Sequence, residues 1–210
     1  MPYQILYLPG FTGRAEPAIM LLEDADAPYE IVSDDVRERV AALAVDHPVF
    51  ACPILIDEGT VVSQTSVITE YLGHKHGYDV DESLRVPAAQ LAYNVADIWR
   101  ETYVGRKNND PTYLDDRFTR WVSVLENSFS NSADDGFFLS DAKPTYVDFL
   151  VLNIVTLADY CWGAPAATEI YAQPRLGSWA QRMLARPRIK AYFDKPSLVP
   201  VGYEAVKAVA

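Results

Sequence analysis

One short segment in the first third of the chain combines two strand-like runs with the start of a helix. An apolar run over residues 54–57 follows Pro53, a turn containing Gly59 comes next, and a second apolar run covers residues 60–63. Two such runs around a tight glycine turn predict a β-hairpin. The polar pair Gln64-Thr65 then opens a helix, whose N-terminus carries unpaired N–H groups and partial positive charge. This segment therefore predicts a site that favours a carboxylate, beside a strand that begins with a proline.

The residues around this hairpin predict a small domain of alternating strands and helices. Short β-type runs cover residues 3–8 and 29–32, and apolar residues near a 3.6-residue period predict helices over 14–25, 36–44 and 65–76. The order βαβ–α–ββα places helices on both faces of a small mixed sheet. We expect this domain to span residues 1–79.

The rest of the chain, after a polar linker over residues 78–85, predicts an all-helical domain over residues 86–210. Thr145 to Asp148 is typical of a capping box, with Asp148 in place of Glu or Gln, and it leads into a very apolar helix that we expect to be buried all round. Prolines mark the starts of two later helices. The expected helices cover residues 87–107, 111–130, 149–157, 174–185 and 187–193.

Composition excludes several classes of function. The 210 residues carry 29 acidic and 18 basic side chains, a net charge of −11, which argues against binding nucleic acid or an anionic membrane surface. Neither a signal peptide nor a transmembrane helix is visible, and two cysteines are too few for a disulfide framework. We therefore expect a cytoplasmic protein. His74 and His76 point to different faces of a helix and His47 is isolated, so no metal site is expected.

Three groups of residues, in this order and spacing, resemble the cytosolic glutathione transferases over nearly the whole chain. They are Leu6-Tyr7-Leu8 with Gly13-Arg14-Ala15-Glu16, Pro53-Ile54-Leu55 with Gln64-Thr65, and Thr145–Phe149 with the tail Ala185–Phe193. A tyrosine at the end of the first strand is similar to the alpha, mu, pi and sigma classes, and the tail is similar to the pi class. The resemblance implies a thioredoxin-like first domain, a helical second domain, a homodimer and glutathione as cosubstrate, with no metal.

The resemblance also implies the roles of several residues. Tyr7 is the expected catalytic group, because a hydroxyl held against sulfur stabilises the thiolate by a charge-assisted hydrogen bond. Gln64 and Thr65 are expected to hold the γ-glutamyl carboxylate, and Arg14 to lie near the active site. In the family the tyrosine usually lies one residue closer to the Gly-Arg pair, so the loop before Arg14 is one residue longer here.

Three further residues are expected to contact glutathione. Pro53 is expected to be cis, turning the backbone N–H and C=O of Cys52 toward the cysteinyl part of the ligand. We expect Cys52 itself to be buried and to act through its backbone rather than its thiol. Asp97 matches an aspartate that reaches across the dimer to the ligand's α-amino group; a solvated helix carboxylate is the alternative.

One part of the expected ligand site departs from the family. A Trp and a Lys often grip the glycyl end of glutathione from the segment before the proline, and residues 36–48 contain neither. Arg39, or else Arg37, is expected to supply the cation. For the apolar electrophile the expected contacts are Leu8, Phe11, Trp99 and Tyr103, with Tyr203 as a further candidate.

The sequence leaves three functions open. The first is a transferase that joins the glutathione thiolate to small apolar electrophiles. A sigma-type glutathione-dependent isomerase is the second, and a non-catalytic ligand-binding or structural member of the family is the third. Phe50 is expected either to insert into a partner subunit or to fill its own core.

Overall fold

The computed structural model describes residues 1–10, 12–110, 112–130 and 136–195, and its N-terminal part is a four-stranded mixed sheet with helices on both faces. The strand order is β2-β1-β3-β4, with β1 parallel to β2 and antiparallel to β3. The elements are β1 (Tyr3–Leu6), η1 (Gly13–Ala15), α1 (Glu16–Asp24), β2 (Tyr29–Val32), α2 (Val36–Leu43), β3 (Ile54–Asp57), β4 (Thr60–Ser63) and α3 (Thr65–His76). This is the expected thioredoxin-like order.

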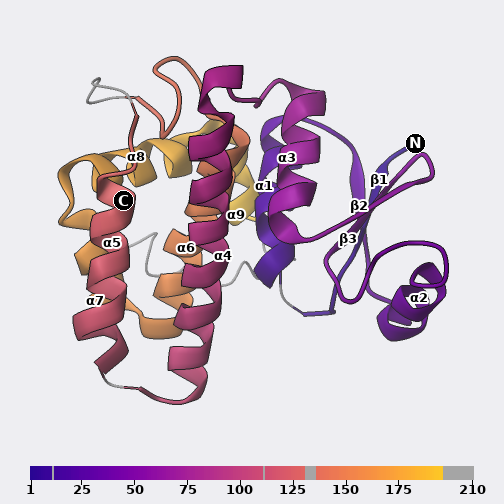
Figure 1. The fold of residues 1–210 in the computed structure, drawn as a ribbon, viewed down its shortest axis with the longest axis horizontal. Helices are drawn as coiled ribbons and strands as arrows, with labels where there is room; N and C mark the ends of the chain where they lie inside the picture. The colour runs from indigo at the N-terminus through magenta and orange to yellow at the C-terminus, as the bar shows by residue number, and fades with distance from the viewer. Residues whose placement is uncertain (11, 111, 131–135, 196–210) are drawn as a thin grey trace.

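The side chains of β1 alternate between the two faces of the sheet, and apolar residues on both faces explain why helices cover both sides. Ile5 belongs to the large apolar cluster that includes α1 and α3, whereas its neighbour Leu6 packs with Val40 and Leu43 of α2. Successive side chains of a strand point to opposite faces, so one buried strand serves two layers. Figure 1 shows α1 and α3 between the sheet and the helical part of the molecule, with α2 on the outer side of the sheet.

The C-terminal part is helical. After the short turn η2 (Glu82–Leu84), the helices are α4 (Arg85–Lys107), α5 (Thr119–Glu126), α6 (Tyr146–Trp162), α7 (Ala164–Tyr171), α8 (Pro174–Ala185) and α9 (Pro187–Phe193). Helix α6 forms the centre of this domain, and every residue from Tyr146 to Asp159 is buried, as the apolar run predicts. The capping box is also confirmed: the Asp148 carboxylate accepts hydrogen bonds from the Thr145 backbone N–H at 2.7 Å and hydroxyl at 2.9 Å.

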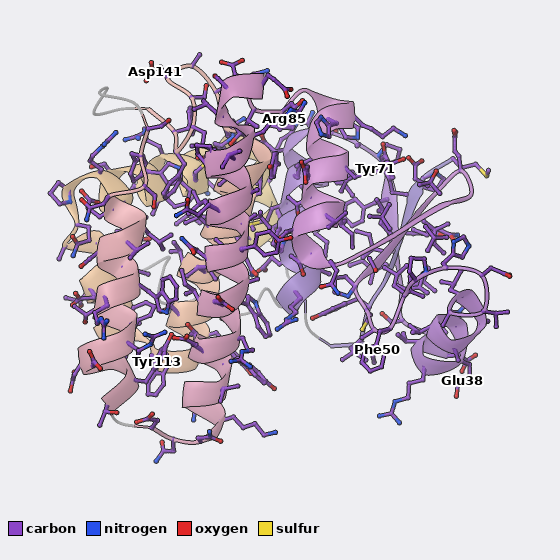
Figure 2. The ribbon with its side chains drawn as sticks, in the orientation of Figure 1. Glu38, Phe50, Tyr71, Arg85, Tyr113 and Asp141 are labelled. Atoms are coloured by element: carbon purple, nitrogen blue, oxygen red, sulfur yellow. The ribbon has the colours of Figure 1, made fainter. Side chains whose placement is uncertain are left out.

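Several predicted boundaries are wrong. Strand β1 ends at Leu6 rather than at residue 8, and the segment 14–25 divides into η1 and α1. The expected helix 111–130 is instead a π-helical segment, η3 (Tyr113–Phe118), followed by α5. Tyr113 lies between α4 and α5 (Figure 2), stacks on Trp162 and shares a 2.7 Å hydrogen bond with Thr102, so tertiary contacts accompany the wider turn. Helix α7 was not predicted, because its short Ala-rich sequence has no clear apolar period.

The two domains meet at a fully buried carboxyl group. Glu16, the first residue of α1, accepts hydrogen bonds from Thr12 (3.0 Å), from Asn153 and Thr156 of α6 (2.8 and 3.0 Å) and from the Tyr192 hydroxyl of α9 (3.5 Å). Burial opposes ionisation more strongly than these four bonds favour it, and the pKa of Glu16 rises from 4.5 to about 7. An ionisable group that burial keeps protonated below about pH 7 thus lies inside the interface between the domains.

This elevated pKa predicts how stability depends on pH. Between about pH 4.5 and 7 the unfolded chain has lost the Glu16 proton while the folded chain still holds it, so stability falls as pH rises through this range. Glu16→Gln removes the titration. The free energy of unfolding of wild type minus that of Glu16→Gln is therefore expected to decrease by on the order of 3 kcal/mol from pH 4 to pH 8. Urea unfolding at fixed protein concentration measures this difference, and a difference that does not change with pH contradicts the burial argument.

Candidate active site

The Tyr7 hydroxyl is held at the end of the first strand by a backbone hydrogen bond. Tyr7 follows β1 directly, is 4% exposed, and its hydroxyl oxygen accepts the Arg14 backbone N–H at 2.8 Å. Burial raises the pKa of Tyr7 to about 12, although the Arg14 N–H acts in the opposite direction. Tyr7 is therefore a neutral phenol near pH 7 and is suited to donate a hydrogen bond to an anion rather than to act as a base.

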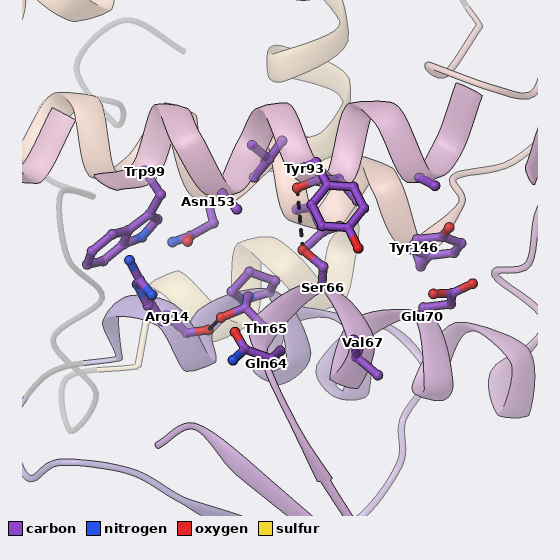
Figure 3. A pocket seen from close by; sticks show the side chains of 16 residues that line it. Arg14, Gln64, Thr65, Ser66, Val67, Glu70, Tyr93, Trp99, Tyr146 and Asn153 are labelled. Atoms are coloured by element: carbon purple, nitrogen blue, oxygen red, sulfur yellow. Dashed lines mark hydrogen bonds between the residues drawn. The ribbon is translucent and has the colours of Figure 1, made fainter. Parts of the chain in front are cut away.

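Arg14 connects Tyr7 to two other elements. Its carbonyl oxygen accepts the Thr65 hydroxyl at 2.9 Å, so the turn η1 is joined to the start of α3. The Arg14 guanidinium lies 4.5 Å from the centre of the Trp99 ring of α4, and Figure 3 shows it between α1 and that ring. Trp99 in turn stacks on Tyr103, with ring centres 5.4 Å apart. Arg14 thus links the predicted catalytic tyrosine to α3 through its backbone and to α4 through its side chain.

The start of α3 has the geometry of an anion site. Gln64 is exposed and holds a backbone φ of +73°, and its carbonyl accepts the first intrahelical bond, from the Ile68 N–H at 2.9 Å. The N–H groups of Thr65, Ser66 and Val67 precede that bond and so have no intrahelical acceptor. With Arg14 close by, these groups provide both the positive potential and the donors that a carboxylate requires.

A cleft of about 290 Å³ runs between α3 and α4, and Arg14, Gln64 and Thr65 are among the residues that line it. Figure 3 shows Arg14, Gln64, Thr65, Trp99 and Asn153 toward one end of it, while Val67, Glu70, Tyr93 and Tyr146 line the other. The end near Arg14 combines polar groups with an aromatic wall. The opposite end is a groove along the surfaces of α3 and α4.

A second cleft, of about 340 Å³, lies beside α2. It is lined by Leu8, Arg37, Ala51 and Cys52 together with the apolar side of α2 and Phe50. The Cys52–Pro53 peptide bond is cis, as expected. The Tyr7 hydroxyl is bonded to Arg14, which lines the first cleft, and Tyr7 precedes Leu8, which lines the second.

The two candidate cations before Pro53 differ in their surroundings. Arg37 lines the second cleft next to Cys52. Arg39 is exposed and its Nε donates to the Asp34 carbonyl at 2.9 Å, a bond back to the preceding turn. Both side chains are exposed, but Arg37 lines the same cleft as Cys52, whereas Arg39 does not line it.

The remaining predicted residues are dispersed. Asp97 is exposed on α4 and does not line the first cleft. Leu8 lines the second cleft, whereas Trp99 lines the first, so the expected electrophile contacts are not in one cavity; Phe11 and Tyr203 lie outside the described residues. Cys52 is half-buried rather than buried, and burial raises the pKa of its thiol, which disfavours a reactive thiolate.

Sequence reasoning missed the residues behind the site. Glu16 ends the Gly13-Arg14-Ala15-Glu16 motif, which gave it no predicted role. Asn153 and Thr156 interrupt the apolar run of α6. A polar side chain in a helix that is buried all round needs a hydrogen-bond partner, so these two residues carried a usable signal. Their partner, Glu16, lies more than 130 residues away in the chain, and only the fold identifies it.

Two absences hold for the part of the chain that the structure describes. Within these residues, no group of three or more His, Cys, Asp or Glu side chains is arranged to hold a metal ion. No described helix is both long and apolar enough to span a bilayer.

Comparison with known proteins identifies the family of this chain. The family model for the glutathione S-transferase N-terminal domain matches residues 5–74, and the one for the C-terminal domain matches residues 92–196. A probable glutathione S-transferase from Caenorhabditis elegans is 24% identical, covering 95% of this chain and 100% of its own length. Glutathione S-transferase P 1 from Xenopus laevis is 25% identical, covering 90% and 91%.

Solved structures show the same fold. A pi-class glutathione S-transferase from Onchocerca volvulus has a TM-score of 0.76 at 19% identity, covering 91% of this chain and 92% of its own. The prostaglandin synthase D structure from Nilaparvata lugens has a TM-score of 0.72 at 20% identity, covering 93% and 98%. With both domain models matched in order along one chain, the protein belongs to the glutathione S-transferase family.

Proposed function

We propose that the protein is a glutathione transferase in which Tyr7 stabilises the thiolate of bound glutathione for attack on small apolar electrophiles. The observation that carries the proposal is the position of the Tyr7 hydroxyl. It is buried, neutral and bonded to Arg14, the residue whose carbonyl is also bonded to the anion-binding start of α3. One ligand carrying both a carboxylate and a thiol fits these two features.

The chemistry follows from the protonation state of Tyr7. A free thiol has a pKa of roughly 8.5, so little thiolate exists at neutral pH. A phenol with a pKa of about 12 keeps its proton and donates it in a hydrogen bond to the sulfur anion. Lowering the thiol pKa by about two units requires roughly 2.7 kcal/mol, which one charge-assisted bond and a helix N-terminus supply. The thiolate then forms a bond to an electrophilic carbon, and a leaving group departs with its electron pair.

A glutathione-dependent isomerase would use the same residues. The thiolate that Tyr7 stabilises serves either reaction, and likeness to a prostaglandin synthase at 20% identity extends to the fold alone. We favour transfer to electrophiles because it needs only the thiolate site described above. Turnover of a generic aryl halide separates the transferase from a binding protein that lacks catalysis.

Arg37 is the cation that we assign to the glycyl carboxylate. It lines the second cleft beside Cys52, where the backbone would pair with the cysteinyl part of the ligand, while the Arg39 side chain is bonded to Asp34. A guanidinium at this place replaces the Trp and Lys that other members of the family use.

A homodimer is the proposed assembly. Phe50, beside α2 in Figure 2, is 95% exposed, which excludes the alternative that it fills its own core. Val67 on α3 and Val86 and Tyr93 on α4 are 50%, 77% and 77% exposed, so both helices present apolar side chains outward. In such a dimer the exposed carboxylate of Asp97 on α4 is available to the ligand of the partner subunit.

Replacing the Tyr7 hydroxyl tests the catalytic proposal. In Tyr7→Phe, the pKa of the bound glutathione thiol is expected to rise by about two units, roughly 2.7 kcal/mol, with little change in glutathione affinity. Ultraviolet titration of the bound thiolate measures the pKa. Tyr3→Phe is the matched control, because Tyr3 lies four residues before Tyr7, in β1, and its hydroxyl is bonded to His76 instead of Arg14. An unchanged thiol pKa in Tyr7→Phe rejects the assigned role.

A pair of arginine variants tests the assignment of the glycyl end. Arg37→Ala is expected to weaken glutathione binding by about fivefold, the upper range for an exposed ion pair, whereas Arg39→Ala leaves it unchanged. Calorimetry with glutathione and with γ-glutamylcysteine, which lacks the glycyl carboxylate, measures the effect. Equal weakening of both ligands by Arg37→Ala contradicts the assignment.

The dimer proposal predicts that removing the Phe50 side chain makes the dimer dissociate more readily on dilution. Phe50→Ser is expected to raise the dimer dissociation constant by at least about tenfold, since it removes a large apolar side chain from the contact. Analytical ultracentrifugation over a dilution series measures this constant. Tyr160→Ser, which changes a 59% exposed aromatic on α6, is the control and is expected to remain dimeric. A wild-type protein that is monomeric at all concentrations refutes the assembly.

A further inference from the structure

The hydrogen bonds of Glu16 surround the segment that positions Tyr7. Thr12 immediately precedes η1 and Glu16 immediately follows it. The Thr12 hydroxyl donates a hydrogen bond to Oε1 of Glu16, so the two ends of this segment are bonded to each other. Between them lies Arg14, whose N–H bonds the Tyr7 hydroxyl at 2.8 Å. Any shift of Thr12 or Glu16 would move the Arg14 N–H with them.

The helical domain anchors this carboxylate. Both Asn153 and Thr156 donate to Oε2, and Thr156 also donates to the Asn153 carbonyl at 3.2 Å, which orients its hydroxyl. All four partners are buried, and the Tyr192 hydroxyl completes the set from α9. The position of η1 is therefore determined from the helical domain as well as from the sheet.

The choice of a carboxylate here matters. Two carboxylate oxygens accept several hydrogen bonds at once, so Thr12 and the two α6 residues all act as donors. When Glu16 is ionised, above its raised pKa of about 7, its negative charge lies at the N-terminus of α1, where the helix dipole favours it. The charge of Glu16 is felt by Tyr7 and Tyr192, and in both cases it disfavours the phenolate.

We propose that Glu16 is a positioning residue for Tyr7: by fastening Thr12 to Asn153 and Thr156, it holds the Arg14 N–H on the Tyr7 hydroxyl. The pKa of the bound thiol then depends on a contact with the helical domain that touches no substrate. This inference rests on the proposed transferase function and adds that the domain interface sets the reactivity of the thiol.

Two buried threonines of the helical domain provide the test. Thr156→Val removes the hydroxyl that donates to Glu16 and to the Asn153 carbonyl while conserving side-chain shape, and Thr102→Val removes one hydroxyl bond to Tyr113, outside the Glu16 network. We expect Thr156→Val to raise the pKa of the thiol of bound glutathione by about 0.5 unit. At a pH below that pKa, this shift reduces the fraction of thiolate by about threefold. Thr102→Val is expected to leave the thiol pKa unchanged, and neither variant should alter the KM for glutathione.

Variants of Glu16 itself separate position from charge. Glu16→Ala, which removes every bond of the network, is expected to raise the thiol pKa by about one unit. Glu16→Gln keeps the shape and an acceptor oxygen for α6, so it should restore at least half of that shift. Equal shifts in the two variants show an effect of charge and overturn the positioning role.

The outcomes distinguish this inference from the function on which it rests. A wild-type protein that does not lower the thiol pKa contradicts the proposed function. A lowered pKa in wild type that is the same in Thr156→Val and Thr102→Val leaves the function intact and overturns the role of Glu16. Should Glu16→Ala not fold, the threonine pair still decides, because each of these variants removes only a hydroxyl group and its hydrogen bonds.

Discussion

The active-site geometry depends on the two backbone groups of Arg14. Its N–H bonds the Tyr7 hydroxyl and its carbonyl accepts the Thr65 hydroxyl, so one residue connects the end of the first strand with the start of α3. The phenol that would contact sulfur and the N–H groups that would hold a carboxylate are thereby kept at a set separation. The extra residue in the loop before η1 does not break this connection, since the Arg14 N–H still reaches Tyr7.

The packing of the two domains supports this arrangement. Helix α1 begins at Glu16, directly after Arg14 and Ala15, and the Glu16 carboxylate is bonded to two helices of the C-terminal domain. On the other side, the Arg14 guanidinium rests on Trp99 of α4. The residues between Thr12 and Glu16 are thus held from the sheet, from α4 and from α6. A site that must orient one hydroxyl gains from such contacts, because small displacements of a hydrogen-bond donor carry a large cost in rate.

Much of the fold followed from local sequence signals, and the failures have physical reasons. The hairpin and α3 match their predicted ranges because a proline, a glycine turn and a polar helix start mark each boundary. Helix α7 has no such apolar period, and the π-helical turn at Tyr113 comes with tertiary contacts to Thr102 and Trp162. The motif identified Tyr7, Gln64 and Thr65 as candidates, but the hydrogen bonds of Arg14 and of Glu16 join distant segments and could not be derived from spacing. That Arg37 lines the cleft of Cys52 likewise depends on the position of α2, which the sequence does not give.

A crystal structure of the protein with glutathione tests the central claim most directly. It is expected to show the sulfur within hydrogen-bond distance, roughly 3 Å, of the Tyr7 hydroxyl, with the Arg14 N–H still bonded to the same oxygen and the γ-glutamyl carboxylate at the first turn of α3. A structure at saturating glutathione in which the Tyr7 ring turns away from the sulfur, or in which the tripeptide binds elsewhere, would contradict the account.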